Sequence, residues 1–196
     1  MNKKQTQEMA AFFVGMLVGG FFTYSFLIDT TPEVVVSEDY HIHADFIVQT
    51  GETVHSYGTA EFMSTAEHIL HPDAHLHDED GEVLHMHEEN ISFAEFLDSL
   101  GIKTTDGCIA LPNDDTYCAV EGASWSLFVN DQLWAGDFTT YVPQDLDRIL
   151  LYYGQPENAS IQTYLDAVTD NACFYSGSCP ERGVAPAESC GLTCEL

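Results

Sequence analysis

Apolar and polar residues alternate along much of the chain from Tyr40 onward. In residues 41–48 (HIHADFIV), polar side chains share one face, and the apolar side chains that share the other are Ile42, Ala44, Phe46 and Val48. This period of two predicts a half-buried strand. Residues 74–87 (AHLHDEDGEVLHMH) alternate in the same way on both sides of Asp80-Gly81, which predicts a hairpin.

Later segments also have strand patterns. Two pairs of short segments predict further hairpins: 108–111 with 117–120, and 126–129 with 132–135. The run RILLYY at 148–153 is almost entirely apolar, as expected of a strand buried on both faces in the middle of a sheet.

Two segments have a helical period instead. Ser92 and Glu95 form a capping box, Gly101 stands where a C-terminal cap belongs, and the apolar stripe between them is Phe93, Phe96, Leu97 and Leu100. Residues 160–168 predict a second helix. The order of these elements predicts an α+β fold. The layout of residues 73–153 is similar to a β-grasp-like mixed sheet, which wraps one helix and leaves its other face open.

Residues 9–28 form an uncharged apolar run, long enough for a helix that crosses a bilayer. Lys3 and Lys4 precede it and acidic residues follow it, so we expect a single-pass cell-membrane anchor with a cytoplasmic N-terminus. The rest of the chain would then be extracellular or periplasmic. A cleaved signal peptide is the alternative. Gly15 and Gly19 would let two anchor helices pack closely, so a homo-oligomer is one expected option.

The composition divides the chain into four parts. We expect a cytoplasmic stub and anchor over 1–28, an acidic linker over 29–39, a histidine-rich α+β ectodomain over 40–156, and a helix with a cysteine-rich tail over 157–196. The six cysteines agree with an oxidising compartment, where an even number indicates disulfides. They are Cys108, Cys118, Cys173, Cys179, Cys190 and Cys194, and the sequence alone does not choose their connectivity.

Negative charge dominates the composition. There are 32 acidic residues against five Lys and Arg, a formal net charge of -27. Such a surface repels nucleic acid and attracts cations. It also suits a protein whose surface is adapted to solubility or to a salty habitat, so the charge alone does not establish metal binding.

All nine histidines lie between residues 41 and 87. Residues two apart on a strand share a face, so each of three H-x-H pairs is placed together. A three-residue turn with Gly81 in the bulge position would put His75 opposite His85, whereas a five-residue turn would put His77 there. Both registers place the four histidines of the hairpin on one sheet face and its apolar residues on the other face.

Clustered imidazoles are ligands for transition metals, with zinc or copper expected here. The predicted ligands are His41, His43, His75, His77, His85 and His87, and additional candidates are His55, His68, His71 and Asp45. A pH-sensing histidine surface and a calcium loop at residues 78–81 are weaker alternatives.

Several stretches together resemble uncharacterised, singly membrane-anchored bacterial envelope proteins. They are HIHADFIV, HLHDEDGEVLHMH, SFAEFLDSLGI, DRILLYYG and CFYSGSCPERG, within residues 40–182. That family has the motifs HxHADF, HxHDxDGxxHxH and CPERG. The resemblance implies a domain layout and an envelope location, and it implies no activity.

The sequence therefore leaves three functions open. The first is an extracytoplasmic metal-binding protein that captures, stores or delivers a divalent cation. The second is a surface interaction or structural module without metal. The third, a cupin-like metalloenzyme, is disfavoured because no H-x-H pair has a glutamate at the cupin offset and no histidine follows residue 87. No motif for other catalysis is found, and no catalytic residue is assigned.

Overall fold

The computed structural model describes residues 40–65 and 67–185. The chain divides into two units, Met1–Glu38 and Asp39–Leu196, and all described residues belong to the second. The predicted anchor and linker, together with Cys190 and Cys194, lie outside the described residues. No helix within 40–65 or 67–185 has the length and apolar character needed to cross a membrane.

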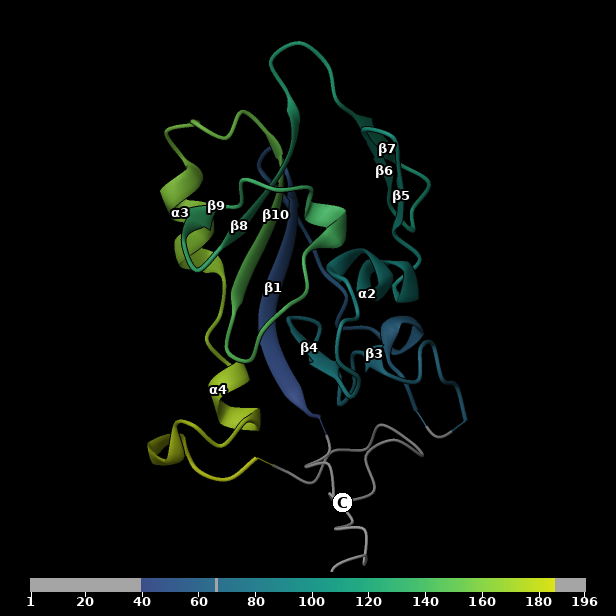
Figure 1. Ribbon diagram of the computed structural model, residues 1–196, viewed down its shortest axis with the longest axis vertical. Coiled ribbons are helices and arrows are strands. Elements are labelled where there is room, and N and C mark those ends of the chain that lie inside the picture. The colour runs from purple at the N-terminus through teal and green to yellow at the C-terminus, as the bar shows by residue number, and fades with distance from the viewer. Residues whose placement is uncertain (1–39, 66, 186–196) are drawn as a thin grey trace, which may run out of the picture. The chain divides into compact units, whose positions relative to one another are not determined.

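A mixed sheet of seven strands forms the centre of the fold (Figure 1). Six strands follow the order β3-β4-β1-β10-β8-β9, and β2 pairs with β1 off this path. The strands are β1 Ile42–Thr50, β2 Thr53–His55, β3 Ala74–His75, β4 Val83–Met86, β8 Ser124–Val129, β9 Gln132–Leu133 and β10 Arg148–Gly154. Only β1 and β10 pair in parallel among these described strands. Strand β10 lies between β1 and β8, and its middle residues are buried, so the predicted buried central strand is confirmed.

A second, three-stranded sheet contains β5 Lys103–Thr105, β6 Cys108–Ala110 and β7 Thr116–Cys118. Cys108 lies opposite Cys118 across the β6–β7 pair, and a disulfide joins them. The hairpin predicted for 108–111 with 117–120 is confirmed as the β6–β7 pair. A second disulfide joins Cys173 to Cys179. Two disulfides indicate an extracytoplasmic domain, because disulfides persist in oxidising compartments.

Helix α2, Phe93–Ser99, begins and ends as the sequence predicts. Ser92 Oγ accepts the backbone N–H of Glu95, and the Glu95 carboxylate accepts the backbone N–H of Ser92. At the other end, Ile102 N–H donates to the carbonyl of Leu97, and Gly101 has a φ of 76°. This is the bonding pattern of a Schellman cap, in which glycine takes the left-handed position.

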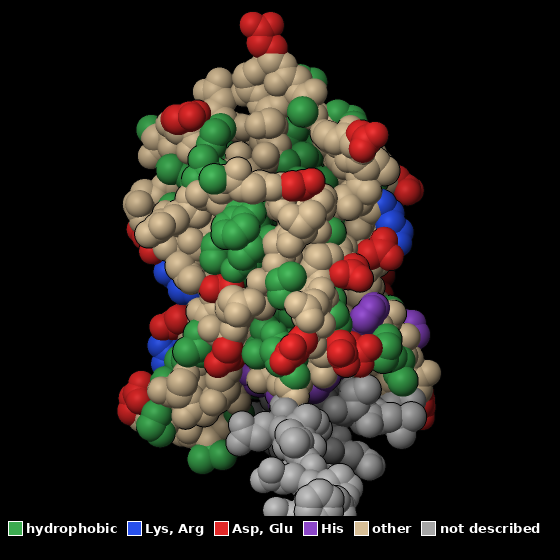
Figure 2. Space-filling model, in the orientation of Figure 1, with side chains coloured by type: hydrophobic (Ala, Val, Ile, Leu, Met, Phe, Trp, Pro, Cys, Tyr) green, Lys and Arg blue, Asp and Glu red, His purple; other side chains and the backbone are tan. Residues whose placement is uncertain are grey.

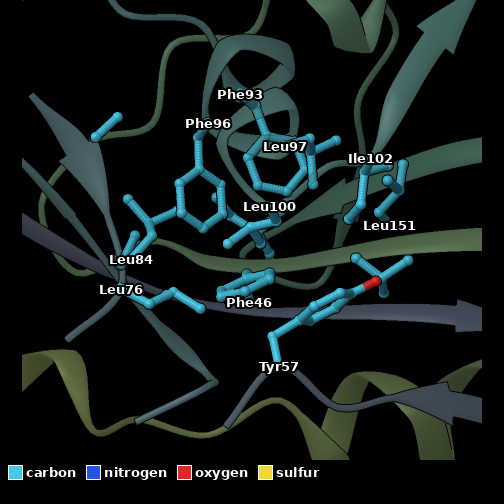
Figure 3. Close-up of a cluster of buried hydrophobic side chains, with 14 of the residues drawn as sticks. Phe46, Tyr57, Leu76, Leu84, Phe93, Phe96, Leu97, Leu100, Ile102 and Leu151 are labelled. Carbon is cyan, nitrogen blue, oxygen red and sulfur yellow. The ribbon is translucent and has the colours of Figure 1, made fainter. Parts of the chain in front are cut away.

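The apolar face of α2 packs on one face of the main sheet. Phe96 meets Phe46 of β1 edge to face, with ring centroids 5.0 Å apart. Figure 3 shows these two rings beside Leu84 and Tyr57. Phe46, Leu84 and Phe96 are at most 1% exposed. Burying each such side chain stabilises the fold by about 1.5–3 kcal/mol.

The opposite sheet face is covered rather than open, so that expectation is wrong. Helix α3, Ile161–Ala167, supplies Leu165 to an apolar cluster with Ile47 and Leu150. The short helix α4, Ala172–Tyr175, contacts β1 farther along. Figure 1 shows α2 on one side of the sheet and α3 and α4 on the other. Three single-turn helices, η1 Ala60–Phe62, η2 Phe138–Thr140 and η3 Pro180–Arg182, complete the described elements.

Candidate metal centre

Three neighbouring strands carry the central histidines in register. His43 of β1 lies opposite His85 of β4, and His85 lies opposite His75 of β3. Cross-strand partners project from the same sheet face, with Cβ atoms about 4.5–5.5 Å apart. Of the two registers that the sequence leaves open, the structure has the one expected of a three-residue turn.

The turn itself differs from the expected glycine bulge. Positive φ angles occur at Asp78 (54°) and Glu79 (60°), whereas Gly81 is outside the left-handed region. A Cβ atom on Gly81 would lie 2.2 Å from the backbone nitrogen of Gly58. Glycine is therefore required at position 81 because two backbone segments meet there.

Six histidine rings gather where these three strands meet: His41, His43, His75, His77, His85 and His87. The ring centroids of His43 and His85 are 4.3 Å apart. The His41 centroid lies 4.5 Å from that of His43 and 4.5 Å from that of His87. The structure thus brings together all six residues that the sequence predicts as ligands; we call this group the histidine cluster.

Within the cluster, His41, His43 and His85 form a triad that could hold a metal ion. One ring nitrogen from each lies within 4.8 Å of the others. In a tetrahedral zinc site with bonds of about 2.0–2.1 Å, the ligand nitrogens are about 3.4 Å apart. Small rotations of the side chains would therefore close the triad on an ion. His43 and His85 are buried, and His41 is half-buried.

A chain of hydrogen bonds from His43 to a carboxylate fixes its tautomer. His43 Nδ1 lies 2.9 Å from Ser176 Oγ, and the Ser176 hydroxyl donates to Oδ1 of Asp145 at 2.6 Å. Because the serine proton goes to Asp145, the serine oxygen accepts the proton of His43 Nδ1. A neutral His43 therefore carries its lone pair on Nε2, the atom that a metal ion needs.

His85 is arranged in the same way through another histidine. His77 Nδ1 lies 2.7 Å from the carboxylate of Asp78, and His77 Nε2 lies 2.8 Å from His85 Nδ1. The carboxylate accepts from His77 Nδ1, so Nε2 of a neutral His77 is an acceptor and His85 Nδ1 is its donor. The lone pair of His85 is then also on Nε2.

His75 has a backbone partner in place of a side chain. Its Nδ1 lies 3.1 Å from the carbonyl oxygen of His71, which can only accept. The lone pair of a neutral His75 is therefore on Nε2. His71 itself is oriented the other way, because its Nδ1 accepts the backbone N–H groups of Asp73 and Ala74 at 3.1 and 3.0 Å.

These contacts separate ligand candidates from supporting residues. Metal-bound histidines usually donate their second ring N–H to a carboxylate or a carbonyl. His75 donates directly to a carbonyl, whereas His43 and His85 reach the carboxylates of Asp145 and Asp78 through one intervening side chain each. All three rings keep Nε2 as the remaining lone-pair atom. His77 uses both nitrogens to connect Asp78 with His85, which makes it a positioning residue for His85.

The cluster favours neutral imidazole at its centre. Burial lowers the pKa of His85 well below its ordinary value, and the neighbouring rings of His77, His43, His75 and His41 lower it further. Neutral imidazole is the form that binds a metal ion.

Helix α4 forms the wall of the cluster opposite the sheet. The Tyr175 ring lies 5.7 Å from that of His43 and 5.4 Å from that of His85. Its hydroxyl donates to Asp80 at 3.1 Å. The adjacent residue is Ser176, the partner of His43. One short segment therefore both covers the rings and orients one of them.

The additional candidates have other roles in the structure. The Asp45 carboxylate accepts the hydroxyl of Thr169 at 2.5 Å and the backbone N–H groups of Asn171 and Ala172 at 2.8 and 3.0 Å. It ties β1 to the segment before α4. His55 lies opposite Val48, and its Nε2 is 2.8 Å from Thr50 Oγ1.

His68 and His71 lie outside any helix. His68 is exposed, and its backbone bonds with that of Thr65. His71 is joined to the cluster by its carbonyl bond to His75.

Sequence patterns did not identify four residues that support the cluster: Asp78, Asp145, Tyr175 and Ser176. Asp145 and Ser176 follow His43 by 102 and 133 positions, so no local pattern connects them. Asp78 directly follows His77, and this neighbouring carboxylate was the one signal available.

The visible surface of the domain is strongly acidic. Figure 2 shows acidic side chains spread over the visible face of the molecule, with few Lys or Arg side chains among them. This agrees with the net charge of -27 for the whole chain. The long-range field therefore favours the approach of cations.

Comparison with known proteins gives no relative from which a function could be transferred. No protein family model matches the chain, and neither a curated protein nor a solved structure is significantly similar to it.

Proposed function

We propose that this protein binds a divalent transition metal ion, zinc or copper, in the cell envelope, and that it captures, stores or delivers that ion. In this proposal, His43 and His85 bind through Nε2, and His41 is the third ligand. His75 and His87 are near enough to exchange with them or to complete the coordination. An N-terminal helix anchors the domain on the outer side of the membrane.

The observation that carries the proposal is the pair of carboxylate-terminated hydrogen-bond chains. Asp145 acts on His43 through Ser176, and Asp78 acts on His85 through His77. Such chains hold a ring in one tautomer and make its second nitrogen more basic. A histidine cluster that merely filled space would not need two chains that leave Nε2 of both facing partners as the lone-pair atom.

Burial of the cluster favours metal binding over an interaction surface without metal. His43, His75 and His85 are 2%, 1% and 0% exposed. A partner protein could not reach rings that are buried to this extent. An ion of atomic size needs only a narrow path, and the half-buried His41 marks the side of the triad nearest to solvent.

The wider features fit a binding role outside the cytoplasm. The disulfides, the acidic surface and the predicted anchor are consistent with a protein that concentrates cations at the membrane surface. The β-grasp-like arrangement and the relation to anchored envelope proteins remain parts of the same proposal. We assign no reaction to the centre.

The test is metal affinity of the full-length chain in detergent at pH 7.5, measured by competition with a chromophoric chelator. The double variant His43→Asn, His85→Asn should bind zinc and copper at least tenfold more weakly, since two imidazole ligands are lost. The matched control is His55→Asn, which removes a histidine outside the cluster and should leave the affinity unchanged. Equal affinity of wild type and double variant would reject the site, and absence of binding by the wild type would reject the function.

A further inference from the structure

The disulfide between Cys173 and Cys179 closes a loop that contains Tyr175 of α4 and the next residue, Ser176, which both contact the histidine cluster. Tyr175 packs against the rings of His43 and His85, and Ser176 accepts from Nδ1 of His43. The second described disulfide, Cys108–Cys118, lies in the three-stranded sheet. Only the first of these two disulfides therefore includes residues that orient a candidate ligand.

The loop is held at its two ends by different means. At its beginning, Ala172 N–H donates to the carboxylate of Asp45 on β1. Toward its end, the backbone N–H groups of Ser178 and Cys179 both bond to the carbonyl of Cys173, at 2.9 and 3.3 Å. The end of the loop is thus bonded back to its own first cysteine, and the disulfide fixes the same pair of residues.

Helix α4 is too short to keep this position alone. It has four residues, and its N-cap residue Asn171 makes no side-chain cap hydrogen bond. Isolated helices shorter than about 12–15 residues are marginal in water. Ser176 follows the helix, and Gly177 then takes a φ of 65°, so the covalent link limits the freedom of a short and flexible sequence.

We propose that the Cys173–Cys179 disulfide is a redox switch that sets the metal affinity of the histidine cluster. This inference rests on the proposed function, because it concerns regulation of the same site. With the disulfide formed, Ser176 and Tyr175 stay against His43 and His85 and the ion is held tightly. With the disulfide reduced, the loop separates from the cluster and the ion is released.

The reductant is a dithiol, such as the active site of a thiol–disulfide oxidoreductase. One dithiol sulfur attacks a sulfur of the Cys173–Cys179 bond and forms a mixed disulfide, which releases the other cysteine as a thiol. The second dithiol sulfur then attacks the mixed disulfide at the first dithiol sulfur and releases the remaining cysteine as a thiol. The protein gains two electrons and two protons as two thiols, and the dithiol becomes a disulfide. Cys173 is half-buried whereas Cys179 is 8% exposed, so Cys173 is the more accessible of the two residues.

Loss of the loop weakens binding in two ways. His43 loses the chain to Asp145 that keeps its lone pair on Nε2, and removal of such supporting bonds typically lowers metal affinity by about 10–100-fold. Displacement of Tyr175 also opens the rings to water, which competes for the ion. The expected change on reduction is therefore a decrease in affinity of at least tenfold.

The experiment compares two full-length disulfide variants in detergent, both in a background with Cys190→Ser and Cys194→Ser so that only the two described disulfides are present. Zinc affinity is measured at pH 7.5 by chelator competition, and folding is checked by circular dichroism. Cys173→Ser, Cys179→Ser should bind zinc at least tenfold more weakly than the background protein. Cys108→Ser, Cys118→Ser is the matched control and should bind with unchanged affinity.

Reduction of the protein decides the matter if the first variant fails to fold. In the control variant, a phosphine reductant acts on Cys173–Cys179 alone; zinc should be released to a fluorescent indicator and rebound after reoxidation. Unchanged zinc affinity after complete reduction, or in the folded Cys173→Ser, Cys179→Ser variant, would overturn the switch while leaving the metal site intact. Failure of the oxidised wild type to bind zinc would instead reject the proposed function.

Discussion

Nε2 of His77 lies 2.8 Å from Nδ1 of His85, which makes His77 an acceptor for its neighbour and leaves it no nitrogen for an ion. The two residues belong to separate H-x-H pairs, His75 with His77 and His85 with His87, and they have different roles. His85 has the geometry of a ligand, and His77 transmits the charge of Asp78 to it. Predictions about the centre therefore concern supporting residues as much as ligands.

Removal of the Asp78 charge should weaken metal binding. In Asp78→Asn the amide no longer requires a proton on His77 Nδ1, so the tautomer of His85 is no longer determined. We expect zinc affinity to fall about 10–100-fold. Asparagine tolerates the positive φ of position 78, so the turn should remain. The control is Glu79→Gln in the same turn, and equal losses in both variants, measured by chelator competition, would contradict the chain through His77.

The metal-free protein should lose stability as the pH falls below about 6.5, the ordinary histidine pKa. The pKa of buried His85 is far lower in the folded state. Below pH 6.5 the unfolded chain therefore binds more protons than the folded one, so its free energy of unfolding decreases with falling pH. Urea unfolding in a chelator at pH 7.5 and 5.5 should show this decrease in the wild type.

Two histidine variants test the origin of that decrease. His85→Gln should reduce the difference in unfolding free energy between the two pH values, because the titrating group is gone. His68→Gln removes an exposed histidine and should leave the difference as in the wild type. If both variants behave like the wild type, His85 is not the group responsible.

The capping box of α2 should contribute measurably to stability. Ser92→Ala removes the acceptor for the Glu95 N–H and should lower the free energy of unfolding by about 1 kcal/mol. Ser160 has the same position before α3 but makes no side-chain cap hydrogen bond, so Ser160→Ala is a matched control with a smaller effect. Urea unfolding at pH 7.5 measures the free energy of unfolding of both variants. Equal losses would show that the Ser92 cap hydrogen bond does not stabilise the protein.

Position 81 should accept no side chain. In Gly81→Ala the new Cβ would overlap the backbone of Gly58, and forced backbone shifts of this kind typically cost about 1–3 kcal/mol. Gly51 has a positive φ but open space around it, so Gly51→Asn should be tolerated far better. A thermal melt that ranks the two variants in the opposite order would contradict this account of Gly81.

The elements that could be predicted from the sequence are those with local signals. The alternation around His43, the capping box at Ser92 and the apolar run of β10 each reflect side chains within a few positions of one another. The register of the hairpin before β4 was predicted, but the role of Gly81 was not, because its backbone meets that of Gly58, a residue from a distant segment. A preference for left-handed glycine is a local argument and could not reveal that contact.

The histidines of the candidate centre could be predicted from the sequence, but their burial could not. The six clustered histidines follow from strand periodicity, which is a property of the hairpin and β1 alone. Their burial depends on α4, whose position is set by hydrogen bonds to Asp45 and by a disulfide. The sequence offers Asp45 as an additional candidate ligand because it lies near histidines, and it gives no indication that the backbone N–H of Ala172 would bond to that carboxylate.

The parallel pairing of β1 with β10 has a consequence for the order of events when the chain is made. Phe46 pairs with Ile149, and Ser176 follows His43 by 133 positions. Strand β1 therefore cannot form these contacts until the last third of the chain has been synthesised. Closure of such long loops costs entropy before any contact is gained, and a high contact order slows folding. The emerging polypeptide therefore exposes its histidines long before Asp145 and Ser176, which orient His43, have been synthesised. In the proposed function, metal loading is then a late step that follows folding.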